Sequence, residues 1–347
     1  MHIHSKLLIL LYCFIFLASG STLAQNSAEE FKKAGDKYFQ ANNFMDAIRQ
    51  YDHAIESDPQ FAKAYFFSAK AKVMLKNLEG GIEDYNKVIK LSPTDSFAFI
   101  NRGNTYALLK KYSNAFSDFD AAIKLYPNSA AAYYNKGMAH YDMKKYETAL
   151  PNFTKSIQLD GKDNKTYFQR GETHYEMKEF AKSIDDYTKS IELKPTAAAY
   201  ISRAQSYKEL GDFASTIKDL KKVIEIDPTI MIVYNNLGYS LVEVGDYEGA
   251  VKVFEDLIAQ DPESPFGYNN LGYALFKQGN NAEAKKQINK SLELNKNNSY
   301  AYRNLALIYI AENELKSACK EIQNALNKGF TENYGPEMEE LKKKHCK

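Results

Sequence analysis

The chain has 347 residues, of which 44% are hydrophobic and 26% are charged, and 45 lysines and arginines face 44 acidic residues. This composition is ordinary for a soluble globular protein. The near-zero net charge excludes the strongly basic surface expected of a protein that binds nucleic acid. Three cysteines are too few for a fold built on disulfides, so their positions matter more than their number.

The start of the chain, residues 1–24, looks like a secretory signal peptide. A short start that contains Lys6 precedes a mostly apolar run, residues 7–18, which is too short to span a bilayer. Small residues follow the run and predict cleavage after Ala24. No later stretch is apolar enough to cross a membrane, so we expect an exported chain without a membrane span after cleavage.

A lipid-anchored start at Cys13 is the alternative to cleavage after Ala24. It is disfavoured because Tyr12 is bulky where a lipobox needs a small residue. We therefore expect the protein in the periplasm or outside the cell, with any association with the outer membrane made through a partner.

The rest of the chain is an internal repeat. Aromatic residues recur at a constant spacing, with a single step that is one residue shorter, and a small residue stands four positions after each of them. A second small site follows twelve positions later, and Pro closes six of the nine frames. Apolar residues at helical spacing on both sides of a polar turn predict two amphipathic helices in every frame. The opening aromatics are Phe31, Tyr65, Phe99, Tyr133, Tyr167, Tyr200, Tyr234, Tyr268 and Tyr302.

This pattern resembles the tetratricopeptide repeat, a helix-turn-helix unit of about 34 residues. The resemblance covers residues 28–332. It implies an all-α fold, a right-handed α-solenoid of nine tandem repeats, whose small sites let the helices approach closely. The shorter step, between Tyr167 and Tyr200, predicts a local bend in the stacking. Residues 333–347, with a last helix from Glu337 to His345, are expected to cap the array.

Arginine and aspartate occur together in three frames. The arginine stands three positions after the opening aromatic and the aspartate sixteen positions later, whereas in the last three frames the arginine site is leucine. Because a charge buried between helices needs a partner, we predict an ion pair that bridges each hairpin. The alternative is unpaired charges that face solvent. The predicted pairs are Arg102–Asp118, Arg170–Asp186 and Arg203–Asp219.

Signatures of catalysis are absent from the sequence, which has no phosphate-binding loop, no HExxH, no CxxC pair and no nucleophile elbow. His140 and His174 occupy equivalent positions where neighbouring frames carry Tyr106 and Tyr207, so we interpret them as core substitutions, with a metal pair as the alternative. We expect no catalytic residue, no metal and no cofactor.

The outer surface of the first helices is the candidate binding site. If the opening aromatic and the first small residue face inward, positions −2, +1, +2, +5 and +8 from the aromatic share the opposite, concave face. In tetratricopeptide proteins this face binds peptides; the alternative is that part of its aromatics pack between frames. The aromatics of this face are Phe66, Phe97, Tyr134, Tyr141, Phe168, Tyr175, Tyr239, Tyr273, Phe276 and Tyr300.

Asparagine repeats at position +2 of the same face. An amide carries both a donor and an acceptor, so a ladder of amides suits the backbone of an extended peptide. The alternative is that these amides bond only to water or to local backbone. Acidic residues outnumber basic ones on the middle of this face, which favours a basic partner segment. The asparagines are Asn101, Asn135, Asn236, Asn270 and Asn304.

Cys319 and Cys346 are the only cysteines left after signal cleavage. In an oxidising location an even pair predicts a disulfide, which here would close a loop of about 27 residues. This ending resembles that of exported bacterial tetratricopeptide proteins.

The function expected from the sequence is therefore a non-enzymatic scaffold of the bacterial envelope. It would be a monomer that holds an extended or helical segment of another protein, of unknown identity, in the concave groove. The alternative is a structural component that self-associates within an envelope complex.

Overall fold

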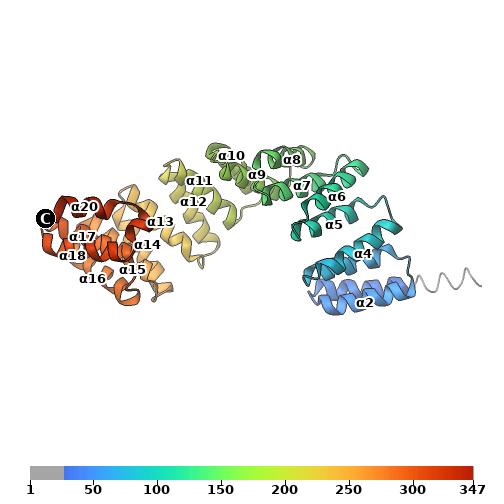
Figure 1. Cartoon of the computed structure of the whole chain (residues 1–347), viewed down its shortest axis with the longest axis horizontal. Coiled ribbons are helices and arrows are strands. Elements are labelled where there is room, and N and C mark those ends of the chain that lie inside the picture. The colour runs from blue at the N-terminus through green and yellow to red at the C-terminus, as the bar shows by residue number, and fades with distance from the viewer. Residues whose placement is uncertain (1–26, 347) are drawn as a thin grey trace, which may run out of the picture. The chain divides into compact units, whose positions relative to one another are not determined.

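The computed structural model describes residues 27–346, which form helices and short connections with no strand among them (Figure 1). The predicted signal peptide lies outside this range. Within the described residues, no helix combines the length and the apolar character that crossing a bilayer requires.

The helices alternate between first and second helices of the predicted repeats, and most have 13 or 14 residues. The first helices are residues 27–40, α3 (Ala62–Met74), α5 (Ser96–Leu108), α7 (Ala130–Asp142), α9 (Asn164–Glu176), α11 (Ala197–Glu209), α13 (Met231–Glu243), α15 (Pro265–Gln278) and α17 (Ser299–Ala311). The second helices are α2 (Phe44–Ser57), α4 (Leu78–Leu91), α6 (Tyr112–Leu125), α8 (Tyr146–Leu159), α10 (Phe180–Leu193), α12 (Phe213–Ile226), α14 (Tyr247–Gln260), α16 (Asn281–Leu294) and α18 (Leu315–Asn327).

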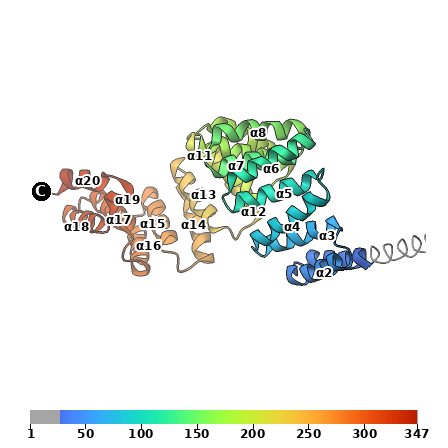
Figure 2. The same cartoon turned by 45° about the vertical axis from the view of Figure 1, so that its right-hand side comes forward.

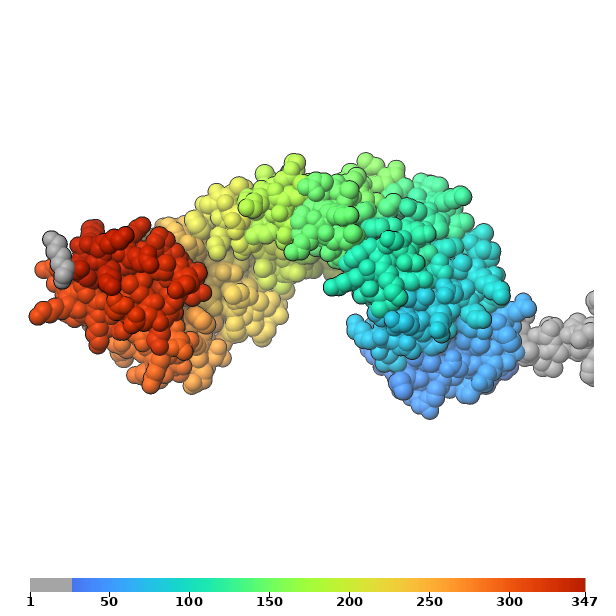
Figure 3. All heavy atoms as spheres, viewed as in Figure 1, coloured from blue at the N-terminus to red at the C-terminus, as the bar shows by residue number. Residues whose placement is uncertain are grey.

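The helices form two compact units, one ending at Thr173 and the other beginning at His174, so that the division falls inside α9. In each unit a first helix packs against its own second helix, and neighbouring first helices such as α13 and α15 also touch. In the space-filling view the helices of each unit are closely packed (Figure 3). The shorter step of the repeat has a local cause: only positions 194–196 link α10 to α11, one fewer than usually connect repeats. The predicted bend stays a prediction.

The centre of every hairpin is a large side chain of the second helix, twenty positions after the opening aromatic. These side chains are almost fully buried, whereas the opening aromatics are half-buried, except for Tyr234, which is buried. The opening aromatics therefore cover the core rather than fill its centre. The central side chains are Tyr51, Tyr85, Phe119, Phe153, Tyr187, Leu220, Phe254, Ile288 and Ile322.

The first small site lies directly under this central side chain. A Cβ atom added to Gly137 would stand 2.8 Å from Cε1 of Phe153, and one added to Gly238 would collide with the ring of Phe254. Glycine is therefore required at these two positions, whereas the second repeat accommodates Ala69 with Tyr85 as its central side chain. This contact sets the spacing of the two helices in the hairpin.

A residue with positive φ ends each first helix, eleven positions after the opening aromatic. The left-handed conformation turns the chain toward the second helix. Only some of these residues are glycine: Gly245 has φ 80°, whereas Lys144 reaches φ 57° with a side chain that this region disfavours. The set is Asn42, Lys76, Lys110, Lys144, Lys178, Gly211, Gly245, Gly279 and Asn313.

The C-terminal end closes the second unit. After α18 come a short helix, α19 (Phe330–Tyr334), and α20 (Glu337–His345), which has the bounds predicted for the last helix. Phe330 and Met338 are buried in a cluster with Ile322, so they cover the apolar face that the ninth repeat would otherwise expose. Helices α18 and α20 lie side by side (Figures 1 and 2).

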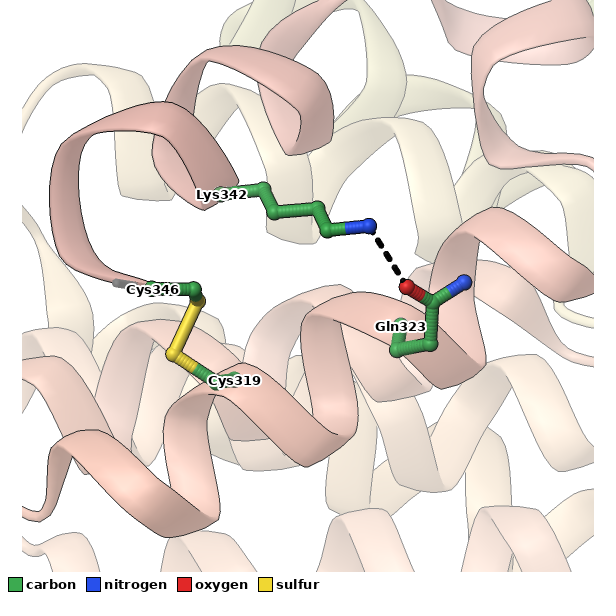
Figure 4. Close-up of a disulfide and its surroundings, with 4 residues drawn as sticks. All are labelled: Cys319, Gln323, Lys342 and Cys346. Atoms are coloured by element: carbon green, nitrogen blue, oxygen red, sulfur yellow. Dashed lines mark hydrogen bonds between the residues drawn. A yellow bond between two sulfur atoms is a disulfide. The ribbon is translucent and has the colours of Figure 1, made fainter.

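A disulfide joins the second helix of the ninth repeat to the residue that follows α20. Cys319 and Cys346 are bonded, with 5.6 Å between their Cα atoms (Figure 4). Nearby, Lys342 Nζ donates to Gln323 Oε1 at 2.8 Å, so a covalent and a polar contact hold the same two helices together.

We predict that Gly137→Ala lowers the stability of the first unit. Overpacking against Phe153 should cost about 1–3 kcal/mol, more than the roughly 1 kcal/mol that alanine gains over glycine in a helix. Urea unfolding followed by circular dichroism measures the difference. Gly161→Ala is the control, because its Cβ would meet nothing closer than 3.6 Å. Equal midpoints for the two variants would contradict the packing role of Gly137.

Candidate binding surface

Two of the predicted ion pairs cross their hairpins at close range. Arg102 donates from Nε and Nη2 to the two carboxylate oxygens of Asp118, at 2.8 and 2.6 Å, and Arg203 binds Asp219 in the same way at 2.7 and 2.8 Å. Both aspartates are buried. The third donor of Arg102, Nη1, reaches Asn86 Oδ1 of the preceding repeat at 2.6 Å. Each pair therefore fixes a hairpin and also links it to its neighbour.

The arginines stay charged in this setting. Hydrogen bonding to Asp219 raises the pKa of Arg203 above its ordinary value, although burial acts in the opposite direction. The third predicted pair, Arg170 with Asp186, joins residues of different units and stays a prediction. Within the first unit, Arg170 Nη1 donates to Thr154 Oγ1 at 3.2 Å.

We predict that Arg203→Leu alone destabilises the second unit by about 3–5 kcal/mol, because it leaves the buried Asp219 without its partner. The double variant Arg203→Leu/Asp219→Val copies the pair Leu237 and Val253, which occupies the equivalent positions one repeat later. It should stay within about 1 kcal/mol of the parent chain. Thermal unfolding of both variants tests this, and a double variant as unstable as the single one would refute the pairing argument.

The first unit carries a groove of about 690 Å³ along its first helices. Phe66, Phe97 and Asn101, all predicted for the concave face, line it together. The side chain of Phe97 is 65% exposed, although it is large and apolar. The other lining residues are Lys32, Ala62, Lys63, Phe67, Lys70, Ser92 and Asp95.

The second unit carries a smaller groove of about 260 Å³, also along its first helices. Tyr239 from α13, Tyr273 from α15 and Tyr300 from α17 line it, together with Asn270 and Asn304. Five residues that their positions in the repeat assign to the concave face therefore lie together here. Burial and the nearby carboxylate of Glu243 raise the pKa of Tyr239, so this phenol remains protonated at neutral pH.

Arg303 is the residue of this second groove that sequence reasoning missed. Its guanidinium lies 5.5 Å from the ring centre of Tyr273 and 5.2 Å from that of Tyr300. It binds Glu337 of α20 through Nε and Nη2, at 3.0 and 2.8 Å. The periodic pattern could not reveal this pair, because Glu337 lies beyond the repeats.

The asparagines of the second unit bond to one another. Asn304 is buried and donates to Asn269 Oδ1 at 2.9 Å, Asn269 donates to Asn270 Oδ1 at 3.2 Å, and Asn270 donates to Asn235 Oδ1 at 2.9 Å. Asn236 is half-buried beside this chain of amides. The amides therefore tie three first helices together.

In the first unit two of the predicted asparagines donate hydrogen bonds to carbonyls of their own helices. Asn101 Nδ2 donates to the carbonyl of Phe97 at 2.7 Å, and Asn135 Nδ2 donates to that of Ala131 at 2.8 Å. The local-backbone alternative thus describes these two side chains. Each of these bonds uses one of the two hydrogens of the amide nitrogen, so the ladder that binds a peptide backbone stays a prediction.

Several predicted groove aromatics serve packing between helices. Tyr134 lies 5.9 Å from Phe153, Tyr141 lies 5.4 Å from Tyr146, and Tyr175 lies 5.5 Å from Phe180, measured between ring centres. Burial is the main cause that raises the pKa of Tyr134. Phe168 is half-buried, and Phe276 lies 6.4 Å from Tyr273.

Two exposed residues of the second unit belong on the candidate surface and were not singled out. Ile232 and Phe266 are 59% and 55% exposed. Both occupy position −2 of their frames, as Phe97 and Tyr300 do, so the position rule already contained the signal that would have found them.

The two histidines have aromatic and carboxylate neighbours. The ring of His140 stacks on Phe116, with 4.3 Å between ring centres, and burial lowers the pKa of His140. His174 Nδ1 lies 2.6 Å from Glu179 Oε2. Within residues 27–346, no three His, Cys, Asp or Glu side chains gather closely enough to hold a metal ion.

Comparison with family models matches the chain to the tetratricopeptide repeat along most of its described length. Models described as "Tetratricopeptide repeat" or "TPR repeat" match residues 32–96, 98–129, 130–163, 165–196, 197–230, 238–279 and 265–298. None of the curated proteins matches the sequence.

Solved structures show the same fold. The C-terminal part of a TPR repeat-containing protein from Cytophaga hutchinsonii is 20% identical, with a TM-score of 0.57, over 69% of this chain and 98% of the other. PilF of Pseudomonas aeruginosa is 19% identical, with a TM-score of 0.53, over 63% of this chain and 99% of the other. At these identities the likeness concerns the fold alone.

Proposed function

This chain belongs to the tetratricopeptide repeat family, and from that premise we propose that it is a protein-interaction scaffold whose first helices bind a segment of another protein without catalysis. The observation that carries the proposal is the pair of grooves, one in each unit, that large apolar side chains line along the first helices. Repeat proteins use such surfaces for extended ligands.

The exposure of large apolar side chains supports a binding surface on the first helices. Phe97, Ile232 and Phe266 are each more than half exposed on first helices. Phe97 lines the groove of the first unit, and Ile232 and Phe266 occupy the same position in their own repeats. Exposed aromatic and aliphatic side chains are typical of binding surfaces. Asn101 and Asn135 each use one donor within their own helix, so we propose that recognition depends on the apolar side chains together with the remaining donor and acceptor groups of the amides.

We predict that Ile232→Ala/Phe266→Ala weakens partner capture at least about tenfold, because we expect these two side chains to be among the few residues that carry most of the binding energy, each of which costs more than about 1 kcal/mol when truncated. The immobilised chain would be incubated with bacterial envelope extract, and bound proteins quantified by mass spectrometry.

Leu210→Ala is the matched control, since Leu210 is 55% exposed but ends α11 at the turn. Equal capture by the Ile232→Ala/Phe266→Ala variant and the control would contradict the proposal. A parent chain that forms stable oligomers and captures no partner, shown by light scattering, would favour self-association instead.

We also propose export to the bacterial envelope. The signal-like sequence of residues 1–24 supports it, as does the Cys319–Cys346 disulfide, because disulfides persist in oxidising compartments. The chain expressed in a bacterial host and purified without reductant should begin at Gln25 and contain no free thiol. Intact-mass and thiol-labelling spectra that show Met1 retained and both cysteines free would contradict export.

A further inference from the structure

The groove of the first unit is basic as well as apolar. Its lining includes three lysines, Lys32, Lys63 and Lys70, and three phenylalanines. Asp95 is the one carboxylate among these lining residues. Lys32 comes from the helix of residues 27–40 and the other two lysines from α3. The charge is therefore contributed by two neighbouring first helices of the unit.

The charges of this groove are only partly compensated. Lys32 Nζ lies 2.8 Å from Asp36 Oδ2 and 4.6 Å from the ring centre of Phe67. Lys70 Nζ stands 5.7 Å from the same ring centre, and no carboxylate of the described residues lies within 4.0 Å of Lys70 or of Lys63.

The only lining carboxylate is occupied by the backbone. Asp95 caps α5, and its Oδ1 accepts from the amides of Phe97 and Ala98 at 2.9 and 3.2 Å. A carboxylate that caps a helix interacts mainly with the amides at the positive end of its own helix, and not with the lysines across the groove. Lys63 and Lys70 therefore give this groove an excess of positive charge.

The groove of the second unit differs in charge. Its cation, Arg303, is already neutralised by Glu337, and Glu243 adds a further carboxylate to its lining. Among the residues that line this groove, an acidic ligand would therefore meet no unpaired cation. The basic character is thus a property of the first unit's groove, and it does not follow from the repeat as such.

We propose that the groove of the first unit selects a partner segment that carries Asp or Glu next to a bulky apolar side chain. This proposal rests on the proposed function and names its ligand chemistry. The apolar side chain packs against Phe97, whose ring is largely exposed, and against Phe66, while the carboxylate meets Lys63 and Lys70. This acidic ligand differs from the basic partner segment that the sequence favoured, because that expectation came from charges on the middle of the concave face.

A phage-displayed library of short random peptides, panned on the full chain, tests the proposal. We expect enriched peptides to carry Asp or Glu beside Phe, Tyr, Leu or Ile. A synthetic peptide of the enriched sequence should bind Lys63→Glu/Lys70→Glu at least about tenfold more weakly than the parent chain, because reversing both charges turns attraction into repulsion. Replacing its acids by the matching amides should also weaken binding to the parent chain.

Lys87→Glu/Lys90→Glu is the matched control, because it reverses two exposed lysines on the second helix α4 and should leave binding unchanged. Circular dichroism checks that both variants keep their helices. Enriched peptides without acids, or equal binding by the two charge variants, would overturn the inference and leave the proposed function standing. A parent chain that enriches no peptide at all would overturn both.

Discussion

The structure depends on one repeated contact, a small residue of the first helix seated under a large side chain of the second. Gly137 under Phe153 and Gly238 under Phe254 are two instances. The contact brings the helix axes together and leaves no room for a larger residue at the small site. Since each hairpin is closed in this way, its remaining apolar faces are free to pack on the next hairpin and to form a stack within each unit.

The same constraint explains why the proposed binding surfaces lie on the first helices. Their inner sides are used by the hairpin contact, and neighbouring first helices touch, so within each unit their outer side chains come together. What differs between the units is the chemistry of these outer side chains. Phenylalanines and unpaired lysines such as Lys63 line the first groove, whereas tyrosines and the neutralised Arg303 line the second.

The sequence predicted the fold well because the hairpin contact is periodic. The same kinds of residue recur at the contact positions of every repeat, so each repeat supports the prediction independently. The groove position of Phe97 followed from the same periodicity. The last helix, Glu337–His345, was predicted for another reason, because a terminal repeat needs a cap. The roles of the asparagines did not follow, because an amide at one helical position can face a ligand, its own helix or its neighbour. Arg303 stands at position +1 after Tyr302, so the positions assigned to the concave face already included it, whereas its partner Glu337 lies outside the repeats.

Site-specific photocrosslinking tests the central claim, that partners bind to the first helices, most directly. A benzophenone amino acid would replace Phe97 or Phe266 on first helices, and Met45 or Ile226 on second helices, all of them well exposed. In envelope extract, at least one first-helix position should crosslink to a partner and neither second-helix position should. Crosslinks confined to Met45 and Ile226 would contradict the account.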